Sequence, residues 1–255
     1  MRGAGSRDER HTSAAGGQLD AKQLSGRISH ASGADELLRL FAAHSAIVNH
    51  IHAANLWNKL GKQRIERRHE GRLEQLVQRT LDLVSSCRAR ELANVSHGVA
   101  KCGLQARAVH PLFVAVAEAA VRGGLAGFKP QKLANTVWAY ATAGVAADAL
   151  YAAVAEAAVR SRLSGVNPRD VANTVWAFAA AGAAADALHA AVAEPAVRGG
   201  LDRFKPQDLS NTVWAYATAD CYHQALLAGC SRVVSDSLAR DPSIWSEEAR
   251  RQLHQ

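Results

Sequence analysis

Hydrophobic and polar residues follow a helical period along much of this chain. The clearest segment begins at Pro130, since proline is tolerated in the first helical turn, and stops at Gly144, since glycine commonly follows a helix end. Between them the apolar residues take the i, i+4, i+7, i+8 spacing of a buried stripe: Leu133, Val137, Tyr140 and Ala141, widened by Ala134 and Trp138. A second stripe predicts a helix over about 147–162, so the unit is a helical hairpin.

The hairpin recurs at a fixed spacing. The pentapeptide Asn-Thr-Val-Trp-Ala occurs at 135–139, 173–177 and 211–215, each copy 38 residues after the last. Weaker copies of the first helix end at Gly103 and Gly61. A repeated unit buries its apolar face on its neighbours. We therefore predict an all-α fold, an α-solenoid of about five helical hairpins with a 38-residue period, preceded by a leading helix near 35–45.

The pattern divides the chain into four parts. Residues 1–33 are rich in Gly, Ser, Ala and charge, which predicts a disordered leader that could hold a targeting segment. Residues 34–127 contain degenerate helical repeats with a basic helix near 62–79, and 128–238 the regular repeats. Residues 239–255 form either a tail or a capping helix.

Composition and charge narrow the function. The chain has a net charge of +7, but residues 91–220 hold only 11 Lys and Arg against 10 Asp and Glu, whereas residues 1–90 hold 15 against 9. The basic character therefore lies upstream of the regular repeats. Four cysteines without metal-ligand spacing predict free thiols. No apolar run is long enough to span a membrane.

The repeat resembles a known family. Residues 130–144 read Pro-Gln-x-Leu-Ala-Asn-Thr-Val-Trp-Ala-Tyr-Ala-x-Ala-Gly. This pattern resembles the octotricopeptide-repeat family of organellar RNA-binding proteins, and is similar to the helical arrays of FAST-kinase-like, RAP-containing proteins and of RNA-editing substrate-binding complexes. The resemblance covers about residues 34–238. It implies binding of single-stranded RNA in a mitochondrion or plastid, in RNA processing, stability, editing or translation.

The first helices offer candidate RNA contacts. Side chains opposite the apolar stripe would line one continuous surface, where readers of this kind place two or three residues against a base. The candidates fall into three rows: Gln131, Arg169 and Gln207; Lys132, Asp170 and Asp208; Asn135, Asn173 and Asn211. The asparagine row is identical in every repeat, so it would contact an RNA backbone or bond neighbouring helices. The variable rows would carry selectivity, unless they are plain solvated surface.

Two further sets have competing interpretations. Arg64, Arg67, Arg68 and Arg72 could anchor phosphates, or could be the charged side of a solvated helix. Trp138, Trp176 and Trp214 could stack on bases. Their position beside the apolar stripe instead favours core wedges between hairpins.

The chain carries no enzyme signature: it lacks a glycine-rich phosphate loop, a deaminase zinc motif and a nucleophile elbow. We expect no catalytic activity, no cofactor, no metal and no membrane partner. The leading interpretation is an organellar RNA-binding repeat protein, which could also contact protein subunits of an RNA-processing complex. The alternative is a protein–protein interaction scaffold without direct RNA contact, favoured by the near-neutral repeats.

Overall fold

The structure, a computed structural model, describes residues 19–160 and 167–253. It is 79% helical, with thirteen α-helices and no strand in these ranges. The predicted all-α class is confirmed. Short 3-10 turns join some of the helices: η1 (Ser45–Ile47), η2 (Arg67–His69), η3 (Val84–Ser86), η4 (Leu201–Arg203) and η5 (Pro242–Ile244).

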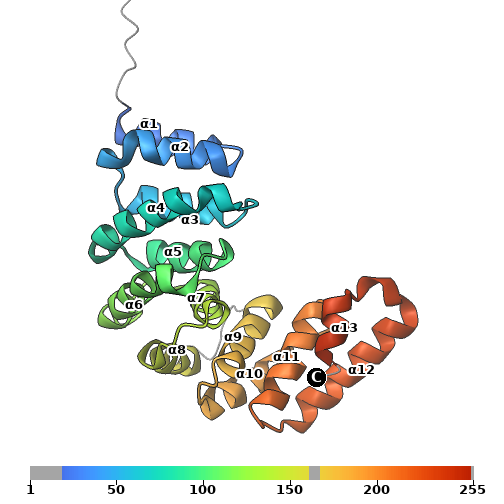
Figure 1. The fold of residues 1–255 in the computed structure, drawn as a ribbon. Coiled ribbons are helices and arrows are strands. Elements are labelled where there is room, and N and C mark those ends of the chain that lie inside the picture. Colours follow the sequence, from blue (N-terminus) through green and yellow to red (C-terminus); the bar gives the residue numbers. More distant parts are fainter. Residues whose placement is uncertain (1–18, 161–166, 254–255) are drawn as a thin grey trace, which may run out of the picture.

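The α-helices form two layers. Odd-numbered helices pack one against the next in the first layer: α1 (Ala21–His30), α3 (His50–Leu60), α5 (Ala89–Lys101), α7 (Pro130–Ala143), α9 (Pro168–Ala180), α11 (Pro206–Thr218) and α13 (Glu247–Leu253). Even-numbered helices form the second layer: α2 (Ala34–His44), α4 (Glu70–Leu83), α6 (Ala106–Arg122), α8 (Asp148–Arg160), α10 (Asp186–Gly199) and α12 (Gln224–Arg240). The stack is bent, and the first layer lies on the inner side of the bend (Figure 1). This arrangement is an α-solenoid.

Each residue of the repeated pentapeptide has its own place. In α7, Val137 is fully buried in the core, and Thr136 and Ala139 are buried with it. The Thr136 hydroxyl donates to the carbonyl of Lys132 at 2.7 Å, so its polar group is satisfied within the helix. The same holds for the other two copies, with Thr174 and Ala177 and with Thr212 and Ala215. Such small side chains let first-layer helices approach one another closely.

Aromatic pairs join the two layers across successive hairpins. Phe113 of α6 meets Tyr140 of α7 edge to face with ring centroids 4.8 Å apart, and the Tyr140 hydroxyl donates to the Phe113 carbonyl at 2.6 Å. His189 and Tyr216 repeat both contacts between α10 and α11. Because each tyrosine is buried and hydrogen-bonded, these pairs fix how one hairpin sits on the next.

Helix ends follow the expected chemistry. Pro130, Pro168 and Pro206 each occupy the first helical position. Gly103, Gly144 and Gly182 follow their helices with φ between 63° and 64°, the left-handed conformation that glycine adopts without strain. In the last copy Asp220 takes this place with φ 52°. An aspartate there is strained relative to glycine.

Asp220→Gly is therefore expected to raise the free energy of unfolding by about 0.5–1 kcal/mol, because glycine adopts the left-handed turn freely. Urea denaturation followed by far-UV circular dichroism measures the change. Gly182→Ala is the reciprocal control and should lower stability by about 1 kcal/mol. A destabilised Asp220→Gly variant would show that the carboxylate, not the backbone, governs this turn.

Three sequence-based expectations need correction. The leader predicted as disordered over 1–33 contains α1, because the Asp20 carboxylate and the Gln23 side chain cap its start reciprocally and Leu24 and Ile28 are buried. Residues 1–18 lie outside the described ranges. The basic helix predicted near 62–79 begins only at Glu70, after a loop and the turn η2.

The third correction concerns the buried side of the first helices. Leu133 and Ala141, predicted to be core, are only half buried, and the buried residues of α7 are Ala134, Thr136, Val137, Ala139 and Tyr140. Each first-layer helix from α3 to α11 packs against a first-layer helix on either side and against the second layer. Burial therefore extends around three sides of the helix, which a two-sided amphipathic pattern does not anticipate.

Candidate nucleic-acid interface

One side of each first-layer helix remains accessible, and four positions spaced i, i+4, i+7, i+11 mark it. These positions lie within about 60° of one another on a helix. We call them the inner stripe. It reads Arg90-Asn94-His97-Lys101 in α5, Gln131-Asn135-Trp138-Thr142 in α7, Arg169-Asn173-Trp176-Ala180 in α9 and Gln207-Asn211-Trp214-Thr218 in α11. Apart from Asn94, whose side chain is engaged by a neighbouring helix, all of these residues are half or fully exposed.

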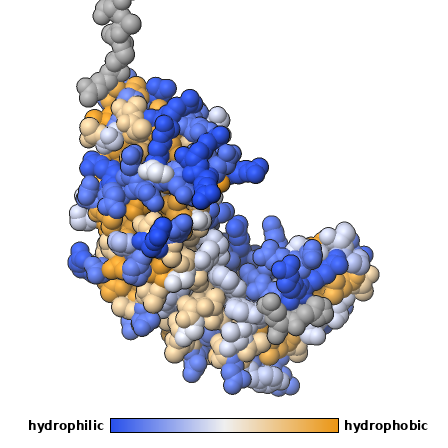
Figure 2. Space-filling model, in the orientation of Figure 1, coloured by the Kyte–Doolittle hydropathy of each residue, from blue (hydrophilic) through white to orange (hydrophobic). Residues whose placement is uncertain are grey.

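The inner stripes of α7, α9 and α11 meet in an open groove of about 790 Å³, which α13 closes at one end. Figure 2 shows that the surface on the inner side of the bend is mostly hydrophilic or neutral in hydropathy. The groove is lined by Trp138, Thr142, Arg169, Asn173, Trp176, Lys205, Gln207, Asp208, Asn211, Trp214, Glu248, Arg251 and Gln252.

The structure brings five of the predicted contact residues into this groove: Arg169, Asn173, Gln207, Asp208 and Asn211. The asparagine row is not a continuous ladder between repeats. Lys132 in α7 donates from Nζ to Oδ1 of Asn94 in the adjacent helix α5 at 2.8 Å. Gln207 donates within α11 to Asn211 at 2.9 Å. Asn135 and Asn173 have no side-chain hydrogen bond to another described residue, so both amides are available to a ligand.

The predicted row Lys132, Asp170 and Asp208 is largely occupied by structural contacts. Asp170 is 4% exposed, and its carboxylate accepts from Nδ2 of Asn167 at 2.8 Å. Asp208 is nearly as buried and accepts from the backbone N–H of Lys205 at 3.2 Å, at the start of α11. Burial raises the pKa of both carboxyl groups. These two aspartates therefore support helix starts, Asp208 through the backbone N–H of the N-cap residue Lys205 and Asp170 through the side chain of the N-cap residue Asn167, which the pattern of variable positions did not suggest.

Positive charge gathers beside the inner stripe of α5. Burial, together with the nearby cations Lys101, Lys132, Arg169 and Lys62, lowers the pKa of His97 to about 4. Burial and the neighbouring Arg90 likewise lower the pKa of Lys132. His97 is therefore an uncharged ring at neutral pH, in a strip where cations from several helices repel one another.

The three repeated tryptophans combine the two environments that the sequence left open. Trp138, Trp176 and Trp214 are each half-buried and pack against the hydrophobic core, and all three also line the groove. Trp176 and Trp214 lie 6.3 Å apart with their planes tilted by 35°, and His97 lies 5.2 Å from Trp138. The threonine and alanine of the pentapeptide are buried in every copy, whereas the tryptophan between them keeps part of its ring accessible.

The four arginines predicted as an anchor lie elsewhere. Arg64 precedes the turn η2, Arg67 and Arg68 are in it, and Arg72 is in α4 of the second layer. All four are exposed, and none lines the groove. Arg68 is engaged in ion pairs with Asp35 at 2.9 Å and Glu66 at 3.5 Å. Gln131 is exposed on the inner stripe of α7, beside the groove rather than in its lining.

Sequence reasoning missed the groove residues contributed by α13 and by Lys205. Glu248, Arg251 and Gln252 reach the groove because α13 packs against α11, where Ser210 donates to the Ala249 carbonyl at 2.9 Å. Gln207 also donates to Gln252 at 3.1 Å. These contacts join residues about forty positions apart in the sequence, and a helical period predicts only contacts within one helix. The i, i+4, i+7, i+11 spacing, in contrast, was readable from the sequence.

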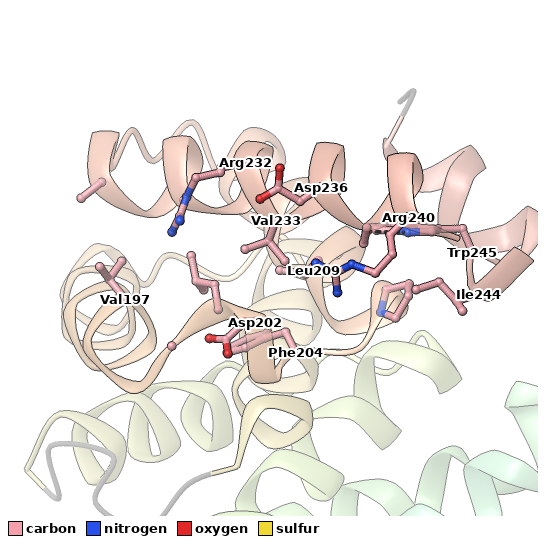
Figure 3. Close-up of a pocket in the computed structure, with 16 residues that line it drawn as sticks. Val197, Asp202, Phe204, Leu209, Arg232, Val233, Asp236, Arg240, Ile244 and Trp245 are labelled. Atoms are coloured by element: carbon pink, nitrogen blue, oxygen red, sulfur yellow. Dashed lines mark hydrogen bonds between the residues drawn. The ribbon is translucent and has the colours of Figure 1, made fainter. Parts of the chain in front are cut away.

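A second cavity of about 430 Å³ lies between α12 and the segment from α10 to α11. Figure 3 shows Arg232, Asp236 and Arg240 of α12 above Asp202 and Phe204. Its lining holds two arginines and two aspartates, all exposed. This balance of charge selects neither an anion nor a cation, so the cavity supports no functional assignment.

Fold and groove define a helical-repeat protein of the α-solenoid class with a basic and aromatic inner face. Residues 28–155, half of the chain, match the family described as Tbc2 translation factor, N-terminal domain, and the chain belongs to this family. The match runs from the end of α1 into α8 and leaves α9 to α13 outside it. It links the chain to translation, whereas no match to the octotricopeptide-repeat or RAP families supports that closer resemblance. No curated protein matches the chain significantly. No helix of the described ranges is long and apolar enough to cross a membrane.

Proposed function

We propose that this protein binds single-stranded RNA on its inner face and acts, without chemistry of its own, in the translation of an organellar message. The observation that carries the proposal is the strip of cations along the first layer. Lys62, Lys101, Lys132 and Arg169 lie near His97, and Lys205 and Arg251 line the groove. Phosphate contacts of this kind supply most of the affinity for nucleic acid.

The local balance of charge supports this proposal better than the net charge of the repeats does. Asp170 and Asp208, which reduce the formal charge of the regular repeats, are buried at helix starts and have raised pKa values. Asp208 and the exposed Glu248 line the groove together with three exposed cations, Arg169, Lys205 and Arg251, so positive charge is in excess there. Membership of a translation-factor family favours an RNA ligand, and the organelle, mitochondrion or plastid, is proposed from the resemblance of the repeats.

A protein scaffold is the second candidate function. The regular repeats remain nearly neutral overall, and the second layer exposes apolar side chains such as Val114 and Val159. Helical arrays bind proteins on such surfaces as readily as they bind RNA. If the protein is such a scaffold, its partner subunits would bind the RNA.

Two sets of charge replacements test where RNA binds. Changing Lys62, Lys101, Lys132, Arg169 and Lys205 to glutamine is expected to weaken binding of an unstructured RNA at least about ten-fold and to flatten its salt dependence. The magnitude of the slope of log affinity against log salt should fall by about 3.5 for five lost phosphate contacts on a single strand. Fluorescence anisotropy of a labelled oligonucleotide, titrated at several salt concentrations, measures both.

The control set is the predicted anchor: Arg64, Arg67, Arg68 and Arg72, also changed to glutamine. Because these side chains lie outside the groove, the salt slope should change little. A larger change in salt slope from these four replacements than from the groove set would indicate that RNA binds at the loop between α3 and α4, and would contradict the groove proposal. If the unmodified protein binds no RNA even at low salt, the scaffold becomes the better assignment.

A further inference from the structure

The tryptophans of this chain fall into two groups with different environments. Trp57 and Trp245 are fully buried, and each indole N–H is hydrogen-bonded, to Thr80 at 2.9 Å and to Ser237 at 2.8 Å. The groove tryptophans Trp138, Trp176 and Trp214 are half-buried, and none of their N–H groups has a hydrogen-bond partner among the described residues. A fully buried indole finds such a partner as a rule, and none of these three N–H groups is among the buried unsatisfied atoms, so they remain accessible to a ligand.

These three rings are only partly used by the packing of the helices. Each packs against the core but keeps an accessible part, whereas the threonine and alanine of the same pentapeptide are buried in every copy. Keeping three large aromatic rings half in water forgoes burial energy at each repeat. A row of them in one groove marks a binding surface for a ligand with flat apolar faces.

The groove combines that row with groups suited to a nucleotide chain. Arg169, Lys205 and Arg251 lie in the same lining and can approach phosphates, while Asn173 offers an unengaged amide. Nucleic-acid bases stack on aromatic side chains in single strands, where the bases are free of a partner strand. Flat rings and cations in one lining match the two parts of a nucleotide chain, its bases and its phosphates.

We propose that Trp176 and Trp214, continued by Trp138, are stacking platforms for successive unpaired bases of an RNA strand laid along the groove. This inference rests on the proposed RNA-binding function and names the residues on which the bases would stack. Stacking is tolerant of sequence, since every base has a flat face. Selectivity would then come from the stripe position that varies between repeats, occupied by Gln131, Arg169 and Gln207.

The test uses the full chain with Trp176→Ala, Trp214→Ala and the matching phenylalanine variants. Each alanine variant is expected to bind a short unstructured oligonucleotide about ten-fold more weakly. Its salt slope should be unchanged, since no phosphate contact is lost. Phenylalanine keeps a ring for stacking and should restore most of the affinity. Tyr222→Ala, at an aromatic side chain that is 80% exposed and outside the groove, is the matched control and should bind normally.

A second readout guards against loss of folding. RNA should quench the fluorescence of the unmodified protein, and the quenching should shrink when Trp176 and Trp214 are both phenylalanine. Alanine variants that bind as tightly as the parent, or quenching that survives the double phenylalanine change, would overturn the stacking assignment and leave RNA binding intact. Absence of any binding by the unmodified protein would instead overturn the proposed function as well. A fully paired duplex of the same sequence should bind more weakly than the single strand.

Discussion

Trp57→Ala is expected to lower the free energy of unfolding by about 3–5 kcal/mol, the range for truncating a large buried aromatic side chain. Trp57 of α3 is fully buried, and its indole N–H donates to Oγ1 of Thr80 in α4 at 2.9 Å. Thr80 in turn donates to the Leu76 carbonyl at 2.6 Å, so the chain of hydrogen bonds ties the two helices of one hairpin together. The truncation removes the ring and leaves the threonine without this donor.

Chemical denaturation followed by circular dichroism measures the loss, and hydrogen exchange shows whether it centres on α3 and α4. Trp57→Phe, which keeps a ring but removes the N–H donor, should be less destabilising. Trp176→Ala is the informative comparison, because its half-exposed side chain contributes less to the core and should lower stability by a smaller amount. Equal losses at Trp57 and Trp176 would contradict the distinction between core and groove tryptophans.

Gly98→Ala is the second large effect, with an expected loss of about 3 kcal/mol from overpacking. A Cβ atom added to Gly98 in α5 would lie 2.2 Å from the carbonyl oxygen of Trp57 in α3. That neighbour is backbone, which cannot rotate away, so the two helices would have to separate. Gly61 also approaches this crossing, with its own Cβ position 3.1 Å from Cα of Gly98.

Gly71→Ala provides a matched control within a neighbouring helix. No atom lies within 4 Å of a Cβ at Gly71, and the residue is exposed in α4. Alanine favours helix there, so stability should rise by at most about 1 kcal/mol. The difference between the two glycine variants in urea denaturation isolates the close approach of α3 and α5. A Gly98→Ala protein as stable as the parent would mean that these helices can move apart at little cost.

The elements of this fold were predictable because each repeat carries its own local signals. Pro130, Pro168 and Pro206 begin helices, and Gly144 and Gly182 end them, for reasons that involve only the backbone of a few residues. The fixed spacing of these signals predicted the stack. Helix α1 was missed although its cap, Asp20 with Gln23, and its apolar pair, Leu24 with Ile28, are local too.

The candidate site was predictable only in part. The asparagine row and the first variable row were correctly placed on the accessible side, and Arg169, Asn173, Gln207 and Asn211 meet in the groove. The tryptophans were predicted only in part: they pack against the core, but they also line the groove, and an aromatic residue beside an apolar stripe has the same local pattern in either environment. Three buried sides around each first-layer helix, supplied by neighbours, decided that these rings remain accessible.

By itself, the sequence determined the helices of the regular repeats, their order and their pairing into hairpins, since caps, period and apolar spacing act over a few residues. Only the tertiary structure decided which face of the first-layer helices stayed accessible, which charged side chains were exposed there, and that α13 closes one end of the groove. The neighbouring helices bury Asp170 and Asp208 at the starts of α9 and α11. The packing of α13 on α11 brings Gln252 within hydrogen-bonding distance of Gln207. The physical reason is that burial and electrostatics are set by neighbours in space, and in a stacked array those neighbours come from the adjacent repeat.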